Sequence, residues 1–73
     1  MNEQDINNAR DILRKMEGAK RKLSNCIAEL NEVWIGASGT DAEDYVSLAI
    51  GKAHVALESI KQAETLINTA IGE

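Results

Sequence analysis

The stretch VWIGASGTDAED, residues 33–44, joins the two halves of this chain and decides its fold. It contains the only tryptophan, two of the five glycines and three acidic residues. Gly36 predicts a helix end, because glycine enters the left-handed conformation of a helix C-terminus without a Cβ clash. Thr40 predicts an N-cap, and Glu43 three residues later completes a capping box that starts a second helix. We therefore expect a turn at residues 36–40 between two helices.

Apolar residues of the first half recur with the alternating three-and-four spacing of a heptad seam. The seam positions are Ile6, Ala9, Leu13, Met16, Leu23, Ile27, Leu30 and Trp34. Lys20 interrupts the seam, either as a device that sets the register or with its stem extended so that the ammonium reaches solvent; we favour the second. A neighbouring row, made of Ile12, Ala19, Cys26 and Val33, widens the apolar stripe. The pattern predicts one helix over residues 3–35.

A second amphipathic segment follows the turn and predicts a helix over residues 41–70. Its expected seam is Val46, Ala49, Ala53, Ala56, Ile60, Ala63, Ile67 and Ala70. The alanines at 49, 56, 63 and 70 recur every seven residues, and such small side chains let two helices approach closely. Because the loop is short, we expect this row to pack on the chain's own first helix, antiparallel. Trp34 is expected to cover the turn and to pack near Tyr45.

The predicted fold is all-α, with residues 1–73 forming a single helical hairpin. Its apolar arcs span about 180° on the first helix and about 220° on the second, whereas one neighbour needs only about 100°. The surplus predicts an interface. Its predicted residues are Leu48, Val55 and Leu66, together with Ala49, Ala56 and Ala63. We expect two hairpins, either two copies of this chain or this chain with a relative, to pair into a dimeric four-helix bundle.

Composition argues against several other classes of protein. The net charge is −4, and the cations between Arg10 and Lys22 are interleaved with Asp11 and Glu17, which favours a solvated helix face over a nucleic-acid surface. The first residues lack the basic and apolar regions of a secretory signal peptide. No apolar run approaches the roughly 20 residues that span a bilayer. A single cysteine excludes an internal disulfide.

Few side chains offer chemistry. His54 and Glu58, four residues apart, are an acid–base or metal candidate, but no second histidine or nucleophile completes a site. Cys26 is expected to be a buried structural thiol. The acidic residues after the turn are candidates for cation binding, although helix capping explains them without an ion. We expect no enzyme activity, no cofactor and no metal site.

Trp34, Ile35 and Gly36 form a W-x-G tripeptide in the turn of the expected hairpin. In this position the tripeptide resembles the motif of the WXG family, the ESAT-like (Esx) small proteins of bacterial type VII (Esx/Ess) secretion systems. The resemblance implies a dimeric four-helix bundle that leaves the cell without a cleaved signal peptide, and it carries Trp34 and Gly36 over as motif residues. It also implies the secretion machinery and a protein partner, either a second copy or a larger LXG-type toxin.

The chain departs from the family in two respects. It is shorter than typical members, and Tyr45 is followed four residues later by Ala49, so the Y-x-x-x-D/E export signal is not matched. The resemblance thus leaves two roles open, a small secreted substrate or a partner that targets a toxin. The alternative is a cytosolic chaperone or antitoxin-like adaptor that masks a partner's apolar helix and is not exported.

Overall fold

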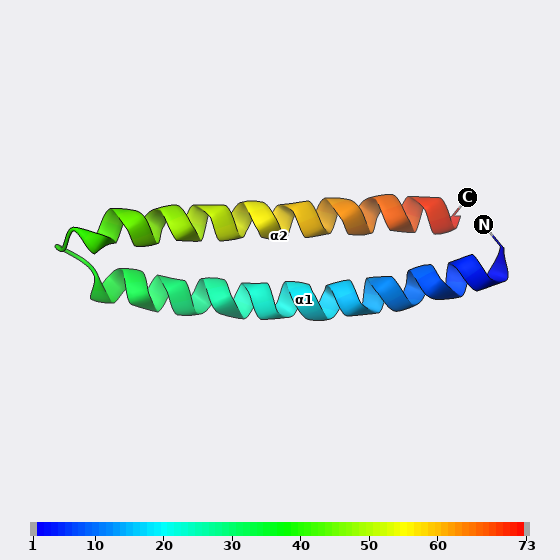
Figure 1. The fold of residues 1–73 in the computed structure, drawn as a ribbon, viewed down its shortest axis with the longest axis horizontal. Coiled ribbons are helices and arrows are strands. Elements are labelled where there is room, and N and C mark those ends of the chain that lie inside the picture. Colours follow the sequence, from blue (N-terminus) through cyan, green and yellow to red (C-terminus); the bar gives the residue numbers. More distant parts are fainter. Residues whose placement is uncertain (1, 73) are drawn as a thin grey trace.

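The computed structural model describes residues 2–72, and two long helices account for nearly all of them. Helix α1 spans Glu3–Gly36 and helix α2 spans Ala42–Gly72. They lie antiparallel and side by side, with the turn at one end and both chain ends at the other (Figure 1). The Cα atoms extend over 56 × 15 × 11 Å. The all-α hairpin predicted from the sequence is confirmed.

Helix α1 begins where its first residues stabilise it. The Asn2 side-chain oxygen accepts a hydrogen bond from the Asp5 backbone N–H at 2.8 Å, and this satisfies one of the free donors of the first turn. Glu3 and Asp5 add negative charge at the positive end of the helix dipole. The start of α1 therefore rests on local capping and charge.

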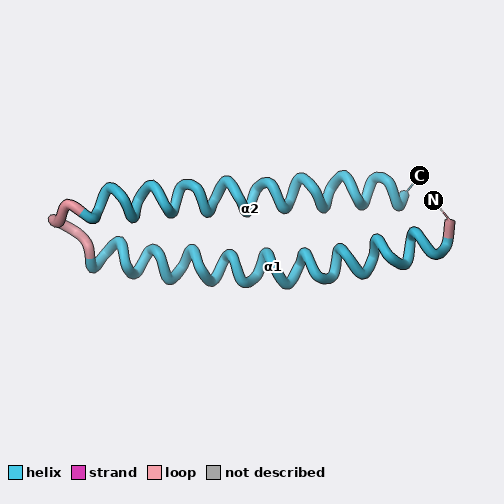
Figure 2. The backbone as a smooth tube through the Cα atoms, viewed as in Figure 1, coloured by secondary structure: helices cyan, strands magenta, loops and turns pink. Residues whose placement is uncertain are grey.

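The turn between the two helices (Figure 2) has its left-handed residue at a different glycine from the one predicted. Gly36 is the last residue of α1, and Ala37 caps the helix with right-handed angles, φ −88° and ψ −2°. Gly39 instead takes the left-handed conformation, at φ 80°. The prediction of a left-handed Gly36 is thus wrong, because α1 includes Gly36 and the backbone is still right-handed at Ala37.

The start of α2 keeps the predicted capping residues in a shifted arrangement. The Thr40 hydroxyl oxygen accepts from the Ala42 N–H at 3.3 Å and donates to the Ala37 carbonyl at 2.6 Å. The Glu43 carboxylate accepts from the Gly39 N–H at 3.1 Å, one residue before the N–H of a standard capping box. Both side chains therefore tie the turn to the first turn of α2.

Replacing Gly36 and Gly39 one at a time with alanine tests which of the two glycines takes the left-handed conformation. Gly39→Ala is expected to lower the free energy of unfolding by about 1–2 kcal/mol, because a Cβ disfavours a left-handed backbone. Gly36→Ala is expected to raise it by about 0.5–1 kcal/mol, because alanine favours a helix more than glycine does and a Cβ there meets nothing within 4 Å. Urea denaturation followed by circular dichroism measures both. Equal effects of the two variants would contradict the turn geometry.

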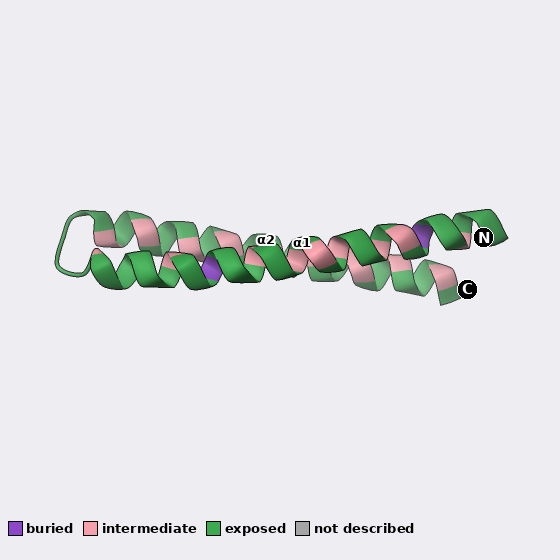
Figure 3. Cartoon of the chain, turned by 90° about the horizontal axis from the view of Figure 1, so that it is seen from below, coloured by how far each residue is buried: buried purple, intermediate pink, exposed green. Residues whose placement is uncertain are grey.

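The seam on α1 is the one predicted. Among the described residues, Ala9 and Ile27 are the buried hydrophobic side chains. The other seam residues of α1 are half-buried, except Trp34 at the turn, which is 40% exposed. The covered positions run along the facing sides of the two helices, and the outward sides stay exposed (Figure 3). The core of the hairpin is therefore a single narrow line of contacts.

The seam on α2 differs from the prediction. Its half-buried residues are Val46, Ile50, Ala53, Leu57, Ile60, Glu64, Ile67 and Ile71. Ala49, Ala56 and Ala70 are exposed, so the expectation that the alanine row packs on α1 is wrong for these three; Ala63 is half-buried. Larger residues one position further along fill the contact instead, because Ile50, Leu57 and Ile71 bury more apolar surface than alanine.

Candidate interaction surface

On each helix, one row of residues lies directly beside the seam. Each residue of this row comes immediately before a seam residue in the sequence, once in every seven residues. On α1 this row is Ile12, Ala19, Cys26 and Val33, and on α2 it is Ala49, Ala56, Ala63 and Ala70. Reversing one helix mirrors the order of its rows, so in an antiparallel hairpin these two rows lie on the same side of the seam. Seven of the eight residues are exposed, and Ala63 is half-buried. We call these eight residues the apolar face.

The opposite side of the hairpin is polar. The rows that follow the seam there are Arg10, Glu17, Ser24 and Asn31 on α1, and Ser47, His54, Lys61 and Asn68 on α2. All eight residues are exposed. The hairpin thus has one broad side suited to water and one broad side suited to another apolar surface.

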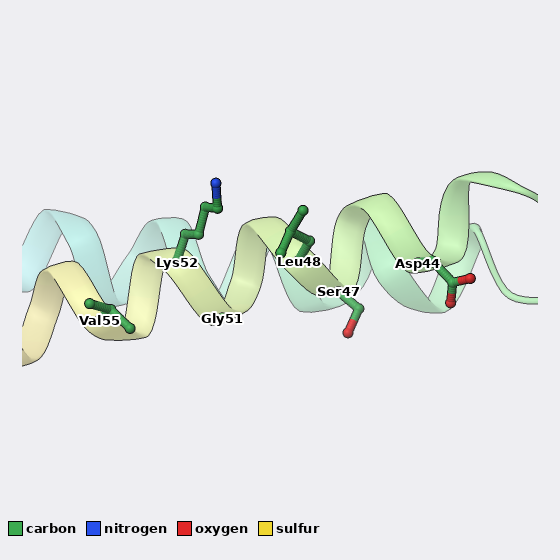
Figure 4. A pocket seen from close by; sticks show the side chains of 6 residues that line it. All are labelled: Asp44, Ser47, Leu48, Gly51, Lys52 and Val55. Atoms are coloured by element: carbon green, nitrogen blue, oxygen red, sulfur yellow. The ribbon is translucent and has the colours of Figure 1, made fainter.

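Helix α2 extends the apolar surface around its outer side. Tyr45, Leu48, Val55 and Leu66 are all more than half exposed. A shallow open groove runs over Asp44, Ser47, Leu48, Gly51, Lys52 and Val55 (Figure 4). A Cβ at Gly51 would meet nothing within 4 Å, so this glycine leaves a notch between Leu48 and Val55. The predicted interface residues Leu48, Val55 and Leu66 therefore lie on the outer side of α2.

The turn end presents the two residues of the W-x-G tripeptide that the resemblance singles out. Trp34 stands on the seam but keeps 40% of its surface exposed, and Gly36 is exposed. Tyr45 is 75% exposed, which leaves its ring with little cover from the rest of the chain. The expected packing of Trp34 near Tyr45 therefore covers little of the tyrosine.

A polar contact crosses the middle of the seam. The Lys20 ammonium donates to Glu17 on its own helix and to Glu64 on α2, each at 2.9 Å. The side chains of Lys20 and Glu64 are only 22% and 13% exposed. Lys20 thus does not extend freely to solvent, as we favoured from the sequence; it pairs across the seam. This pairing supports the register device, because a shift by one heptad would leave both charges facing apolar residues.

The same contact predicts how stability varies with pH. Hydrogen bonds to Glu17 and then Glu64 raise the pKa of Lys20 above its usual 10.5, and Lys20 lowers the pKa of Glu17 below its usual 4.5. The contribution of Glu17 is therefore present above pH 4.5 and lost as the pH falls through its lowered pKa. The contribution of Lys20 is present below pH 10.5 and lost as the pH rises through its raised pKa.

We expect the stability difference between the native chain and Glu17→Gln to be constant near neutral pH and to disappear in acid. Urea midpoints at a series of pH values measure it. The difference is small, since Glu17 is exposed and solvent screens its charge. A difference that grows as the pH falls below 4.5 would contradict the assigned ion pair.

The other candidate side chains are not brought together. His54 and Glu58 are both exposed, and within residues 2–72 no ion pair joins them. Cys26 is exposed on the apolar face, so the expected buried thiol is wrong. No group of three His, Cys, Asp or Glu side chains in the described part of the chain is placed to hold a metal ion. Glu43, one of the acidic residues after the turn, caps the turn backbone.

Part of the cationic segment of α1 is paired within its own helix. Arg14 and Lys15 both bind Asp11, and Lys15 in particular lowers the pKa of that carboxyl. These pairs lie on the exposed surface. They support the interpretation of this segment as a solvated helix face.

No protein-family model, curated protein or solved structure matches this chain. Neither α1 nor α2, over residues 2–72, is long and apolar enough to cross a membrane.

Proposed function

We propose that this chain is a non-enzymatic interaction protein, whose apolar face binds a partner hairpin to complete a four-helix bundle. The observation that carries the proposal is the imbalance between core and surface. The hairpin buries Ala9 and Ile27, whereas eight large hydrophobic residues stay exposed. Ile12 and Val33 lie on the apolar face, and the other six lie at the turn end or on the outer side of α2. Exposed apolar surface on this scale marks a binding surface in a chain too small for a large core of its own.

The finer proposal is a WXG-like role in a bacterial type VII secretion system. The chain would act as a small secreted substrate, or as the dimer partner and targeting factor of a larger LXG-type toxin. The turn supports this role, because Trp34 keeps much of its ring exposed and Gly36 occupies a helical position that would accept a side chain. The hairpin itself therefore does not require the glycine of the tripeptide.

Two substitutions test the role of the tripeptide. Trp34→Ala and Gly36→Ala are expected to abolish partner binding or export from a cell with a type VII system. Circular dichroism of each purified variant separates this loss from a loss of helicity, because Trp34→Ala also removes a seam contact. Ile35→Ala is the control, because Ile35 lies between them and is 68% exposed. Binding and export are measured by co-purification and by detection in culture fluid. Unchanged binding and export of Trp34→Ala would remove the support for the WXG assignment.

The second candidate is a cytosolic chaperone or antitoxin-like adaptor that masks a partner's apolar helix and is not exported. The exposed apolar face favours it as well, because this surface would cover an apolar helix of any partner. Fractionation of unlysed cells separates the two candidates. Finding the chain in culture fluid, with a cytosolic marker retained in the cells, would exclude the adaptor.

A further inference from the structure

The side of α2 that faces away from α1 carries a second row of residues with heptad spacing. From residue 45 the row takes every third or fourth position, at 45, 48, 52, 55, 59, 62, 66 and 69, and all eight residues are exposed. Four of them are large and apolar, namely Tyr45, Leu48, Val55 and Leu66. We call these eight residues the back row. The back row shares no residue with the apolar face.

The corresponding row on α1 has the composition of a solvated surface. Its positions are 8, 11, 15, 18, 22, 25, 29 and 32, and they hold five charged residues, two asparagines and a glycine. The back row of α2 holds a single charged residue, Lys52. A helix with one neighbour needs one apolar stripe of about 100°, so a second stripe on the opposite side indicates a second neighbour.

Most polar residues of the back row can be covered without losing a hydrogen bond. The Ser59 hydroxyl donates to the Val55 carbonyl at 3.1 Å, and the Thr69 hydroxyl donates to the Thr65 carbonyl at 2.9 Å. Both hydroxyl donors are therefore satisfied within α2 and need no water. Lys52 is different, because within residues 2–72 no carboxylate forms an ion pair with it.

The groove on this side of α2 has the spacing of the holes that receive side chains from a neighbouring helix. In knobs-into-holes packing, a residue of one helix inserts among four residues of the next, spaced i, i+3, i+4 and i+7. The six residues that line the groove form two such holes (Figure 4), made of Asp44, Ser47, Leu48 and Gly51, and of Leu48, Gly51, Lys52 and Val55. Another shallow hollow repeats the second hole two heptads further along, and it is lined by Gln62, Thr65 and Leu66.

Gly51 belongs to both holes of the groove. A glycine inside a helix destabilises that helix relative to alanine. The hairpin does not require a glycine here, since a Cβ at Gly51 would meet nothing within 4 Å. A helix that packs closely on this side of α2 would require it, because the missing side chain lets the neighbour's side chains reach the α2 backbone.

Charge defines the chemistry of this neighbour. Asp44 and Lys52 lie towards opposite ends of the groove, about two helical turns apart. A complementary helix presents a cation to Asp44 and a carboxylate to Lys52, with apolar side chains between them. Two copies of this chain with their back rows aligned bring no carboxylate to Lys52, because it is the only charged residue among the eight. The pattern therefore favours another protein.

We infer that the back row of α2 binds a single amphipathic helix of another protein, whose apolar side chains fill the holes around Gly51 and whose carboxylate pairs with Lys52. The inference goes beyond the proposed function, because it uses none of the residues of the apolar face. Helix α2 is then the middle helix of three, with α1 on one side and the partner's helix on the other.

Two synthetic helical peptides, each as long as the back row, test the site. Both carry leucine at heptad spacing along one side. The first has a glutamate in that row and a lysine two turns away, and the second has the two charges exchanged. Fluorescence anisotropy is expected to show that the native chain binds the first peptide at least about tenfold more tightly, and that Lys52→Glu removes this preference. Binding of neither peptide, or equal affinity of the native chain for both, overturns the inference.

Two adjacent substitutions separate the back row from the apolar face. Val55→Glu adds a charge to the back row and Ala56→Glu adds the same charge to the apolar face, and both residues are exposed in the hairpin. Val55→Glu is expected to weaken binding of the first peptide at least about 100-fold, because its carboxylate would be buried without a partner. Ala56→Glu is expected to bind the peptide like the native chain. The reverse result overturns the assigned side of α2.

Substitutions at Gly51 give a loss of binding that unfolding cannot imitate. Gly51→Ala and Gly51→Leu are both expected to raise the helicity of the chain, because each introduces a better helix former. Both are expected to weaken binding of the first peptide, and Gly51→Leu more strongly, because leucine fills both holes. Unchanged binding by Gly51→Leu overturns the inference.

The failures of the inference and of the proposed function are distinguishable. A chain that binds a partner hairpin, loses that binding on Ala56→Glu and binds neither peptide overturns the site on the back row but keeps the proposed function. Binding of the first peptide by a chain whose apolar face binds no partner keeps the site and overturns the proposed function. Self-association of the native chain that Val55→Glu abolishes overturns another protein as the occupant of the back row.

Discussion

Replacing Ile27 with alanine is expected to lower the free energy of unfolding by about 2–4 kcal/mol. Ile27 is 7% exposed and, with Ala9, supplies the fully covered part of the described core. The substitution removes apolar contact and leaves a cavity that two rigid helices cannot close. A core of this size supplies at most about 3–5 kcal/mol of stability, so this one substitution is expected to remove a large part of it.

Urea denaturation followed by circular dichroism at 222 nm, a standard helix signal, measures this effect. Ile35→Ala is the matched control, because it deletes the same atoms from a side chain that is 68% exposed. The control is expected to change the free energy of unfolding by less than about 0.5 kcal/mol. Equal losses from the two variants would contradict the position of the seam.

Reversing the charge of Lys20 is expected to be the most damaging exchange of a single charged residue. Lys20→Glu places a carboxylate beside Glu17 and Glu64, inside the seam, where the native ammonium binds both. The half-buried Glu64 then lacks a counter-charge and faces a like charge, which costs far more than the loss of a surface pair. We expect a low helical content and no cooperative unfolding transition.

The double variant Lys20→Glu with Glu64→Lys restores opposite charges across the seam. It is expected to regain most of the helicity and a cooperative transition, although Glu17 remains beside a carboxylate. Arg14→Glu is the control, because Arg14 pairs with Asp11 on the exposed surface. A double variant no better folded than Lys20→Glu would show that the contact between Lys20 and Glu64 does not fix the register.

The sequence predicted both helices because their signals are local. The heptad spacing of α1 has a single interruption, and Thr40 and Glu43 mark the start of α2. The turn was harder, because Gly36 and Gly39 both permit a helix end and only the path of the chain decides between them. Gly39 takes the left-handed conformation because α1 continues through Gly36.

The predicted seam on α2 is misplaced because the apolar residues of this helix cover a wider arc than its contact with α1. The alanine row and the row of Ile50, Leu57 and Ile71 fit the same spacing, and Glu64 interrupts the second row. The signal that could have decided between the two rows is the pair of charged residues that interrupt the apolar pattern, one on each helix. Lys20 breaks one seam and Glu64 breaks the other, and their opposite charges pair when the helices are antiparallel. This pairing of charges is not visible in the sequence of either helix alone.

The narrow contact between the helices also explains why Cys26 is exposed. It stands in the row beside the seam, and a hairpin covers only the seam itself, so the thiol stays exposed. The alanines missing from the core are likewise exposed on the apolar face. Residues that looked like core from the sequence are therefore surface in the single hairpin, and they form the surface that we propose a partner covers.

The solution mass of the chain, measured by light scattering together with helicity over a range of concentrations, tests the central claim most directly. If the partner is a second copy, the account predicts a highly helical species of twice the 7.9 kDa chain mass, which loses helicity on dilution. If the partner is another protein, it predicts a monomer of low helicity. A highly helical monomer that unfolds cooperatively at every concentration would contradict it, because such a hairpin would be stable with its apolar face in water.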